Sequence, residues 1–299
     1  MDGGTKPVNA FESYHPAVLL FYFLSVTLLT MFTSHPVILL LSVLSAVCFF
    51  GMLARRRELR SSLAFYIPAF LLIAVTNPLF SHNGVTPLFF LNDNPVTLEA
   101  VLYGAAIAAM LIAVVYWFKC FSEVMTSDKF LYLFGRAIPR LSLLLSMALR
   151  FLPLFRQKAR SIRRTQKTLG LYASKSITDR IQASVRVFSA LVTWSLENAV
   201  ETADSMKARG YGLAGRTSFS LFRFTGRDGA LLAVSLLLFL PVCLGYGRYL
   251  GFGFYPEITP LSFTAPACIL YFLLFLLLFL PFFIEIKEAV TWKYLRSKI

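Results

Sequence analysis

Six apolar stretches dominate the chain, and each is close to the length that an α-helix needs to cross a lipid bilayer, roughly 20 residues. They cover Ala17–Phe32, Val37–Leu53, Leu63–Phe80, Leu98–Phe118, Gly229–Tyr246 and Phe263–Ile284. Of the 299 residues, 57% are hydrophobic and 15% are charged. Soluble domains have about 45–50% apolar and about 25% charged residues. The sequence therefore predicts an all-α integral membrane protein with about six transmembrane helices.

Lysine and arginine are distributed unevenly among the segments that connect these stretches. Four arginines lie within Arg55–Arg60, whereas Ser81–Thr97 contains no Lys or Arg. The segment 119–228 holds nineteen Lys and Arg against seven Asp and Glu, which is most of the net charge of +14. Because basic loops stay on the cytoplasmic side, we expect both termini and segment 119–228 to be cytoplasmic. Ser81–Thr97 should lie outside.

This charge distribution divides the chain into three parts. Residues 1–118 are predicted to form an N-terminal membrane part with four spans. Residues 229–299 form a C-terminal membrane part with two spans and a tail. Between them, residues 119–228 are too apolar and too periodic for a linker, so we expect a cytoplasmic block of long helices inserted between spans four and five.

The first long helix of this block is predicted to begin near Pro139, a residue suited to the first helical position. It should continue to about Lys167, with a kink or break at Pro153. Beyond Pro153, cations at steps of three and four residues share one face. They are Arg156, Arg160, Arg163 or Arg164, and Lys167. This face fits contact with anionic lipid headgroups and docking on an acidic protein surface equally well.

A second helix follows, and Ser176-Ile177-Thr178-Asp179 fits a capping-box start. Its apolar residues recur at three- and four-residue steps, which makes one continuous stripe over about seven turns, or roughly 40 Å. The stripe consists of Ile181, Val185, Phe188, Val192, Leu196, Ala199, Ala203 and Met206. We expect this helix to pack against the membrane part and to present one end to another molecule.

The second helix should end at Gly210. Lys207 and Arg209 fall in the last turn, where the helix dipole favours positive charge, and glycine suits the left-handed position just past the end. For these residues alone, a well-formed helix stop is the preferred interpretation. The first helix ends near Gly170, so two consecutive helices each stop at a basic turn and a glycine. This pairing is compatible with two docking elements.

Motifs for nucleotide binding and hydrolysis are missing from the sequence. It contains no GxxxxGK[ST], HExxH or GxSxG. The glycines of Gly210–Gly215 match the GxGxxG spacing, but they follow a helix rather than a strand and therefore carry almost no weight. The four cysteines and three histidines are scattered, and we interpret them as core or interfacial side chains.

Two other classes of function remain open. Glu197, Glu201 and Asp204 share a helical face, so one hypothesis is an integral membrane enzyme with a metal bound there. Pairing of these carboxylates with Lys207 and Arg209 is the preferred interpretation. The other hypothesis is a self-sufficient permease that binds its own substrate. Few ionisable groups lie within the spans, so machinery for ion coupling is not evident.

Several groups of residues in the middle segment resemble the signature of the transmembrane T component of energy-coupling factor (ECF) transporters, a family that includes the cobalt-type T subunits. The groups are Leu196–Ala199, Ser205–Gly212 and Gly215–Thr217, with Ala148–Pro153 and Lys167–Gly170 upstream. The resemblance covers about Pro139–Asp228, and the flanking spans agree in layout rather than in motifs.

The resemblance implies a non-catalytic coupling subunit of an ATP-driven importer of vitamins or metal ions. Such a chain would lie in the cytoplasmic membrane of a bacterium or archaeon. Its expected partners are two ABC-type ATPase subunits, which would bind ATP and Mg, and a small substrate-binding membrane subunit, the S component. We expect the chain itself to bind no cofactor, no metal and no nucleic acid.

The resemblance also assigns ATPase docking to two Ala-Arg-Gly signatures that close the two coupling helices. The second signature falls on Ala208-Arg209-Gly210. The first falls on Thr168-Leu169-Gly170, where Leu169 replaces the arginine. Lys167, or Arg163 and Arg164 one turn earlier, could supply the charge, although less specifically, because a lysine cannot reproduce the planar fork of an arginine. We therefore expect unequal docking, in which Arg209 matters more than Leu169. We also expect the apolar stripe of the second helix to carry motion to the S component.

Overall fold

The computed structural model describes residues 10–54, 56–81, 83–91, 94–170, 177–213 and 222–296. These residues are almost entirely helical, which confirms the predicted all-α membrane fold. The N-terminal elements are η1 (Phe11–Ser13), α1 (Pro16–Met31), α2 (Pro36–Leu53), α3 (Arg56–Phe80), β1 (Pro87–Leu91), β2 (Asn94–Thr97) and α4 (Leu98–Val124). They are followed by α5 (Ser127–Ala137), α6 (Pro139–Thr168), α7 (Ile177–Ala208), α8 (Gly226–Tyr249) and α9 (Ala265–Arg296).

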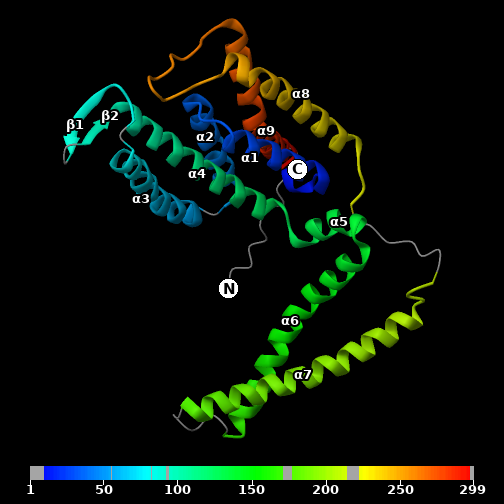
Figure 1. Ribbon diagram of the computed structural model, residues 1–299. Coiled ribbons are helices and arrows are strands. Elements are labelled where there is room, and N and C mark those ends of the chain that lie inside the picture. Colours follow the sequence, from blue (N-terminus) through cyan, green and yellow to red (C-terminus); the bar gives the residue numbers. More distant parts are fainter. Residues whose placement is uncertain are drawn as a thin grey trace. The chain divides into compact units, whose positions relative to one another are not determined.

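The chain divides into two compact units, whose elements are labelled in Figure 1. The membrane unit consists of Met1–Lys129 and Phe222–Ile299, and the helical arm consists of Phe130–Leu221. The boundaries predicted from charge, 118/119 and 228/229, refer to the places where the chain is expected to leave the membrane. The division into compact units does not test them, so they stay predictions.

Five helices of the described chain are long and apolar enough to cross a membrane, namely α2, α3, α4, α8 and α9. The sixth predicted span, α1, is apolar but has only 16 residues. Most helix ends lie within a few residues of the predicted apolar stretches. The exceptions are α3, which begins at Arg56 rather than Leu63, and α4 and α9, which continue past the predicted ends Phe118 and Ile284 to Val124 and Arg296. Helical structure persists there because the polar residues that flank these stretches are also compatible with a helix.

Aromatic and small polar side chains fill the core of the membrane unit. Tyr22 and Trp117 are fully buried, and the Tyr22 hydroxyl donates a hydrogen bond to the Leu277 carbonyl at 3.0 Å. Trp117 Nε1 donates to Ser42 Oγ at 3.0 Å, and Ser42 Oγ lies 2.7 Å from Thr30 Oγ1. Within hydrocarbon, an unsatisfied polar group costs several kcal/mol, so these bonds link α1, α2, α4 and α9 specifically.

The helix α3 rests on α4 at the edge of this unit. Only 6% of the residues in its apolar segment are buried, compared with 22–39% in the other four candidate spans. The two backbones approach closely at Gly104, where an added Cβ would lie 2.5 Å from the Ala74 carbonyl oxygen. Asn77 Nδ2 also donates to the Ala100 carbonyl at 2.8 Å. A glycine and an amide therefore hold α3 in place, rather than extensive burial.

A short antiparallel hairpin, β1–β2, occupies the predicted outer loop. Its base is fixed to the first turn of α4, because Thr97 caps that helix and accepts a hydrogen bond from the Ala100 N–H. Glu99 accepts from the Thr86 hydroxyl at 2.8 Å. The turn signals of this loop were visible in the sequence, but its strands were not predicted.

In the helical arm, α6 begins at Pro139 as predicted. It runs through Pro153 without interruption, so the helix does not break there, while the predicted kink stays a prediction. Proline removes one backbone hydrogen bond to the carbonyl four residues earlier. Here that residue is Leu149, and both Leu149 and Pro153 are exposed, so water can satisfy the carbonyl. The helix α7 has 32 residues, or about 48 Å, and the predicted cap at Ser176 lies outside the described residues.

Candidate functional site

The end of α7 is closed by a Schellman motif, as the predicted stop at Gly210 requires. Gly210 has a φ of +78° and donates its N–H to the Lys207 carbonyl at 2.9 Å. The Tyr211 N–H donates to the Met206 carbonyl at 3.0 Å. This pair of bonds turns the chain sharply away from the helix axis. Arg209 and its neighbour Ala208 are exposed at the turn.

The end of α6 has the same local geometry. Gly170 has a φ of +76° and donates its N–H to the Lys167 carbonyl at 3.1 Å. Leu169 therefore occupies the position that Arg209 has in α7, immediately before a left-handed glycine. Its side chain is 71% exposed, which is unfavourable in water for an isolated leucine.

The two helices cross each other (Figure 1), and residues near their middles are in contact. At the crossing, the Trp194 ring packs edge-on against Phe155, with a centroid distance of 5.5 Å. Lys158 Nζ lies 5.6 Å from the centre of the same indole ring. From this point each helix continues for about 13 residues or more, or roughly 20 Å. The structure therefore places Leu169 and Arg209 on separate limbs and does not bring them together.

The side of α7 that packs on α6 is made of small and aromatic residues. Ala183 and Val187 are buried, and Trp194 shares their face at 3.6 residues per turn. The predicted apolar stripe lies on the opposite side of the helix. Its members Val185, Phe188, Val192, Leu196, Ala199 and Ala203 are exposed, while Met206 is half-buried. Among the described residues of the helical arm, none covers these six exposed side chains, and the coupling role of the stripe stays a prediction.

An open cleft of about 510 Å³ lies between the first half of α6 and the last turns of α7. It is lined by Arg150 from α6 and by Glu201, Ser205 and Arg209 from α7, among others. Tyr211 also lines it, beyond the Schellman turn. The sequence interpretation assigned no role to Arg150 or Tyr211. Their signal was their position, since one lies in the upstream motif and the other directly follows Gly210.

The acidic residues Glu197, Glu201 and Asp204 are exposed along α7. Within the described ranges of the chain, no group of three His, Cys, Asp or Glu side chains is arranged to share a metal ion. The basic residues of α6 predicted to share a face, from Arg156 to Lys167, are likewise exposed.

Comparison with known proteins identifies the family of the chain. The family model CbiQ, described as cobalt transport protein, matches residues 11–219. The chain belongs to this family. The match spans α1 to the end of α7 and so includes both helix ends described above, which confirms the resemblance to the T components noted in the sequence.

Curated relatives carry the name energy-coupling factor transporter transmembrane protein EcfT. The protein of Bacillus selenitireducens is 36% identical over 99 residues, which are 32% of this chain and 37% of that protein. That of Listeria innocua is 36% identical over 97 residues, with the same coverage of 32% and 37%. That of Bacillus subtilis is 32% identical over 103 residues, 34% of this chain and 38% of that protein. The chain thus matches less than two fifths of the length of these relatives, which are named as transporter components.

Proposed function

We propose that this CbiQ-family chain is the transmembrane coupling subunit of an ATP-driven ECF-type importer. In this role it binds two ABC-type ATPase subunits, which hold ATP and Mg, and a separate substrate-binding S component. The chain lies in the cytoplasmic membrane with both termini and the helical arm on the cytoplasmic side. It imports vitamins or metal ions as part of the complex and catalyses no reaction itself.

The observation that carries this proposal is the presentation of Arg209 at the closed end of α7. The Schellman turn directs the chain away from the helix, so the arginine is exposed beside the last turn. A guanidinium offers five donors in a rigid fork that suits carboxylate groups and carbonyl oxygens. We assign Ala208, Arg209 and Gly210 to one ATPase contact, and Lys167, Leu169 and Gly170 to the other.

The proposed coupling step depends on the separation between the end of α6 at Leu169 and the end of α7 at Arg209. When the ATPases close on ATP, the ends of α6 and α7 are displaced. Because both helices are continuous, their displacement moves the exposed stripe from Val185 to Met206. An S component that covers this stripe would experience the motion. Anionic lipid headgroups are expected along the basic residues of α6, at about 1 kcal/mol per cation near the surface.

Co-purification of the tagged chain with its ATPases tests this proposal. Reversing the charge in Arg209→Glu should reduce the amount of ATPase recovered at least about tenfold, because a lost charge-assisted bond is joined by repulsion. Arg186→Glu is the matched control, since Arg186 is an exposed cation of the same helix, far from its end. Full ATPase recovery and transport with Arg209→Glu would refute the proposed docking.

A further inference from the structure

The chain passes between the membrane unit and the helical arm twice, at Lys129/Phe130 and at Leu221/Phe222. Next to each passage, one residue of the membrane unit is hydrogen-bonded to the same short segment of that unit, Ala10–His15. We call this segment the N-terminal brace. It contains η1 and precedes α1.

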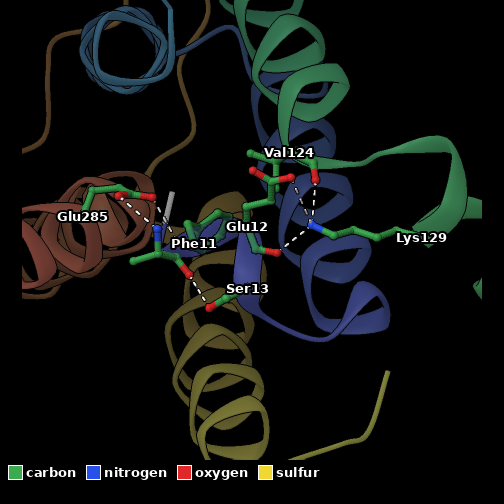
Figure 2. Close-up of polar contacts among 7 residues, drawn as sticks. Phe11, Glu12, Ser13, Val124, Lys129 and Glu285 are labelled. Carbon is green, nitrogen blue, oxygen red and sulfur yellow. Dashed lines mark hydrogen bonds and ion pairs between the residues drawn. The ribbon is translucent and has the colours of Figure 1, made fainter. Parts of the chain in front are cut away.

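At the first passage, Lys129 is bonded to the brace and to the end of α4, as Figure 2 shows. Its ammonium donates to the Glu12 carbonyl at 2.6 Å and to the Val124 carbonyl at 2.9 Å. It also lies 4.0 Å from Glu12 Oε1. The side chain is only 7% exposed, and burial lowers the pKa of this lysine. A buried ammonium needs such partners, so this residue fixes the start of α5.

At the second passage, Asp228 bonds the brace to the first turn of α8. Its Oδ1 accepts the backbone N–H of His15 at 2.7 Å. Its Oδ2 accepts the N–H and the hydroxyl of Thr225 at 2.8 and 2.6 Å, which completes a capping box. The His15 ring also packs edge-on against Phe224, two residues after the passage, at 5.4 Å.

The brace is in turn attached to α9 and to the core. Glu285 of α9 accepts the backbone N–H of Phe11 at 2.9 Å and that of Ala10 at 3.2 Å (Figure 2). The Phe11 ring is fully buried and makes edge-on contacts with Tyr22 and Phe49. The segment that holds both passages is therefore anchored on the most buried part of the membrane unit.

We propose that the N-terminal brace is a positioning element, which holds both connections to the helical arm at fixed points of the membrane unit. This inference rests on the proposed function. A displacement of the arm can move the membrane unit only if the two connections between them are rigid. With the brace released, the arm moves while its connections give way, and ATP hydrolysis proceeds without the coupled motion.

Hydrogen–deuterium exchange of the full-length chain in lipid nanodiscs tests the brace without any partner. Glu285→Leu removes the acceptors of the Ala10 and Phe11 N–H groups but touches neither connection. We expect exchange to accelerate about tenfold in peptides covering 125–131 and 222–229 alike. Glu257→Leu is the matched control, because Glu257 is an exposed carboxylate of the same unit in the connection between α8 and α9. Acceleration confined to residues 10–15, or to one connection, would overturn the proposal.

Two further variants keep the test decisive if Glu285→Leu does not fold. Lys129→Met should loosen only the first connection, and Asp228→Asn only the second. The double variant should loosen both, with η1 still protected by Glu285. Uniform acceleration across the membrane unit in either single variant would indicate general destabilisation and contradict a local brace.

The assembled transporter separates this role from docking. Brace variants should retain the co-purified ATPases and their ATP hydrolysis, unlike Arg209→Glu. The ATP-dependent distance change between nitroxide labels at Thr193 and Leu244, both exposed, should broaden or disappear in brace variants. The labelled chain has its native cysteines replaced by alanine. An unchanged distance response would overturn the coupling role. Absence of ATPases from the parental preparation would overturn the proposed function, while the exchange experiment would still decide on the brace.

Discussion

Arg209 and Leu169 occupy equivalent positions at the ends of α7 and α6. Each directly precedes a glycine with positive φ, +78° at Gly210 and +76° at Gly170, and each glycine donates its N–H to the carbonyl three residues earlier. The backbone geometry is therefore repeated, while the chemistry is not. One end carries a charged fork of five donors, and the other carries an exposed apolar side chain.

This inequality predicts different effects of removing the two side chains. Arg209→Ala should weaken ATPase binding by tenfold or more, since hydrogen bonds of charged groups contribute about 1.5–3 kcal/mol. Leu169→Ala should weaken it clearly less, because it removes apolar contact alone. ATPase affinity measured for the two purified variants under the same conditions decides the matter. Equal losses would show that both helix ends contribute alike.

The close approach of α3 and α4 predicts a strong effect at Gly104. In Gly104→Val the new side chain would collide with the Ala74 carbonyl. Overpacking of this kind costs about 1–3 kcal/mol, and the apparent melting temperature in detergent should fall by several degrees. Gly247→Ala provides the control, since an added Cβ there meets no atom within 4 Å. A melting temperature for Gly104→Val equal to that of the parent would contradict the contact.

His35 predicts a pH dependence of stability. It is buried at the start of α2, where Nε2 lies 3.0 Å from the Tyr271 hydroxyl and Phe252 covers the ring. Burial lowers the pKa of His35 from its ordinary 6.5. The unfolded chain therefore takes up a proton first as the pH falls, so stability decreases below about pH 6.5.

Thermal unfolding at pH 7.5 and 5.5 checks this expectation. The decrease on acidification should be smaller in His35→Gln, which has no imidazole to protonate. Tyr271 is the titratable neighbour of the ring, and it stays neutral over this range. Identical decreases in the parent and the variant would assign the pH dependence to other groups.

The acidic residues of α7 offer a test of the metalloenzyme hypothesis. Replacing Glu197, Glu201 and Asp204 by glutamine together should leave assembly with the ATPases and transport within about twofold of the parent. These carboxylates are exposed, and exposed ion pairs contribute only about 0–1 kcal/mol each. Complete loss of transport in a complex that still assembles would instead favour a metal-dependent role for this face.

Local sequence signals were sufficient for the ends of the long helices. Pro139 and Gly210 mark the start of α6 and the turn after α7 because their backbone preferences act within one helical turn. The orientation of α7 could not be predicted in the same way. Hydrophobicity marks the Val185 side, yet the helix buries the Ala183 and Val187 side, where small residues allow α6 to approach.

Sequence patterns could not predict the N-terminal brace for another reason. Its bonds join residues such as Phe11 and Glu285, which are 274 positions apart, and no periodicity connects them. A backbone N–H also pairs with any carboxylate, so the identity of Phe11 gives no indication of its partner. Lys129 carried a weak signal, as a cation beside an apolar stretch, but its acceptors are main-chain carbonyls of Glu12 and Val124.

The same separation has a consequence for biosynthesis. Ribosomes add about 5–20 residues per second, so on the order of tens of seconds pass between the synthesis of Phe11 and that of Glu285. The Tyr22 hydroxyl, which bonds to the Leu277 carbonyl 255 positions later, waits nearly as long. Newly inserted α1 must therefore persist in the bilayer as part of an unfinished bundle. The helix α9 therefore completes contacts whose other partners were synthesised long before it.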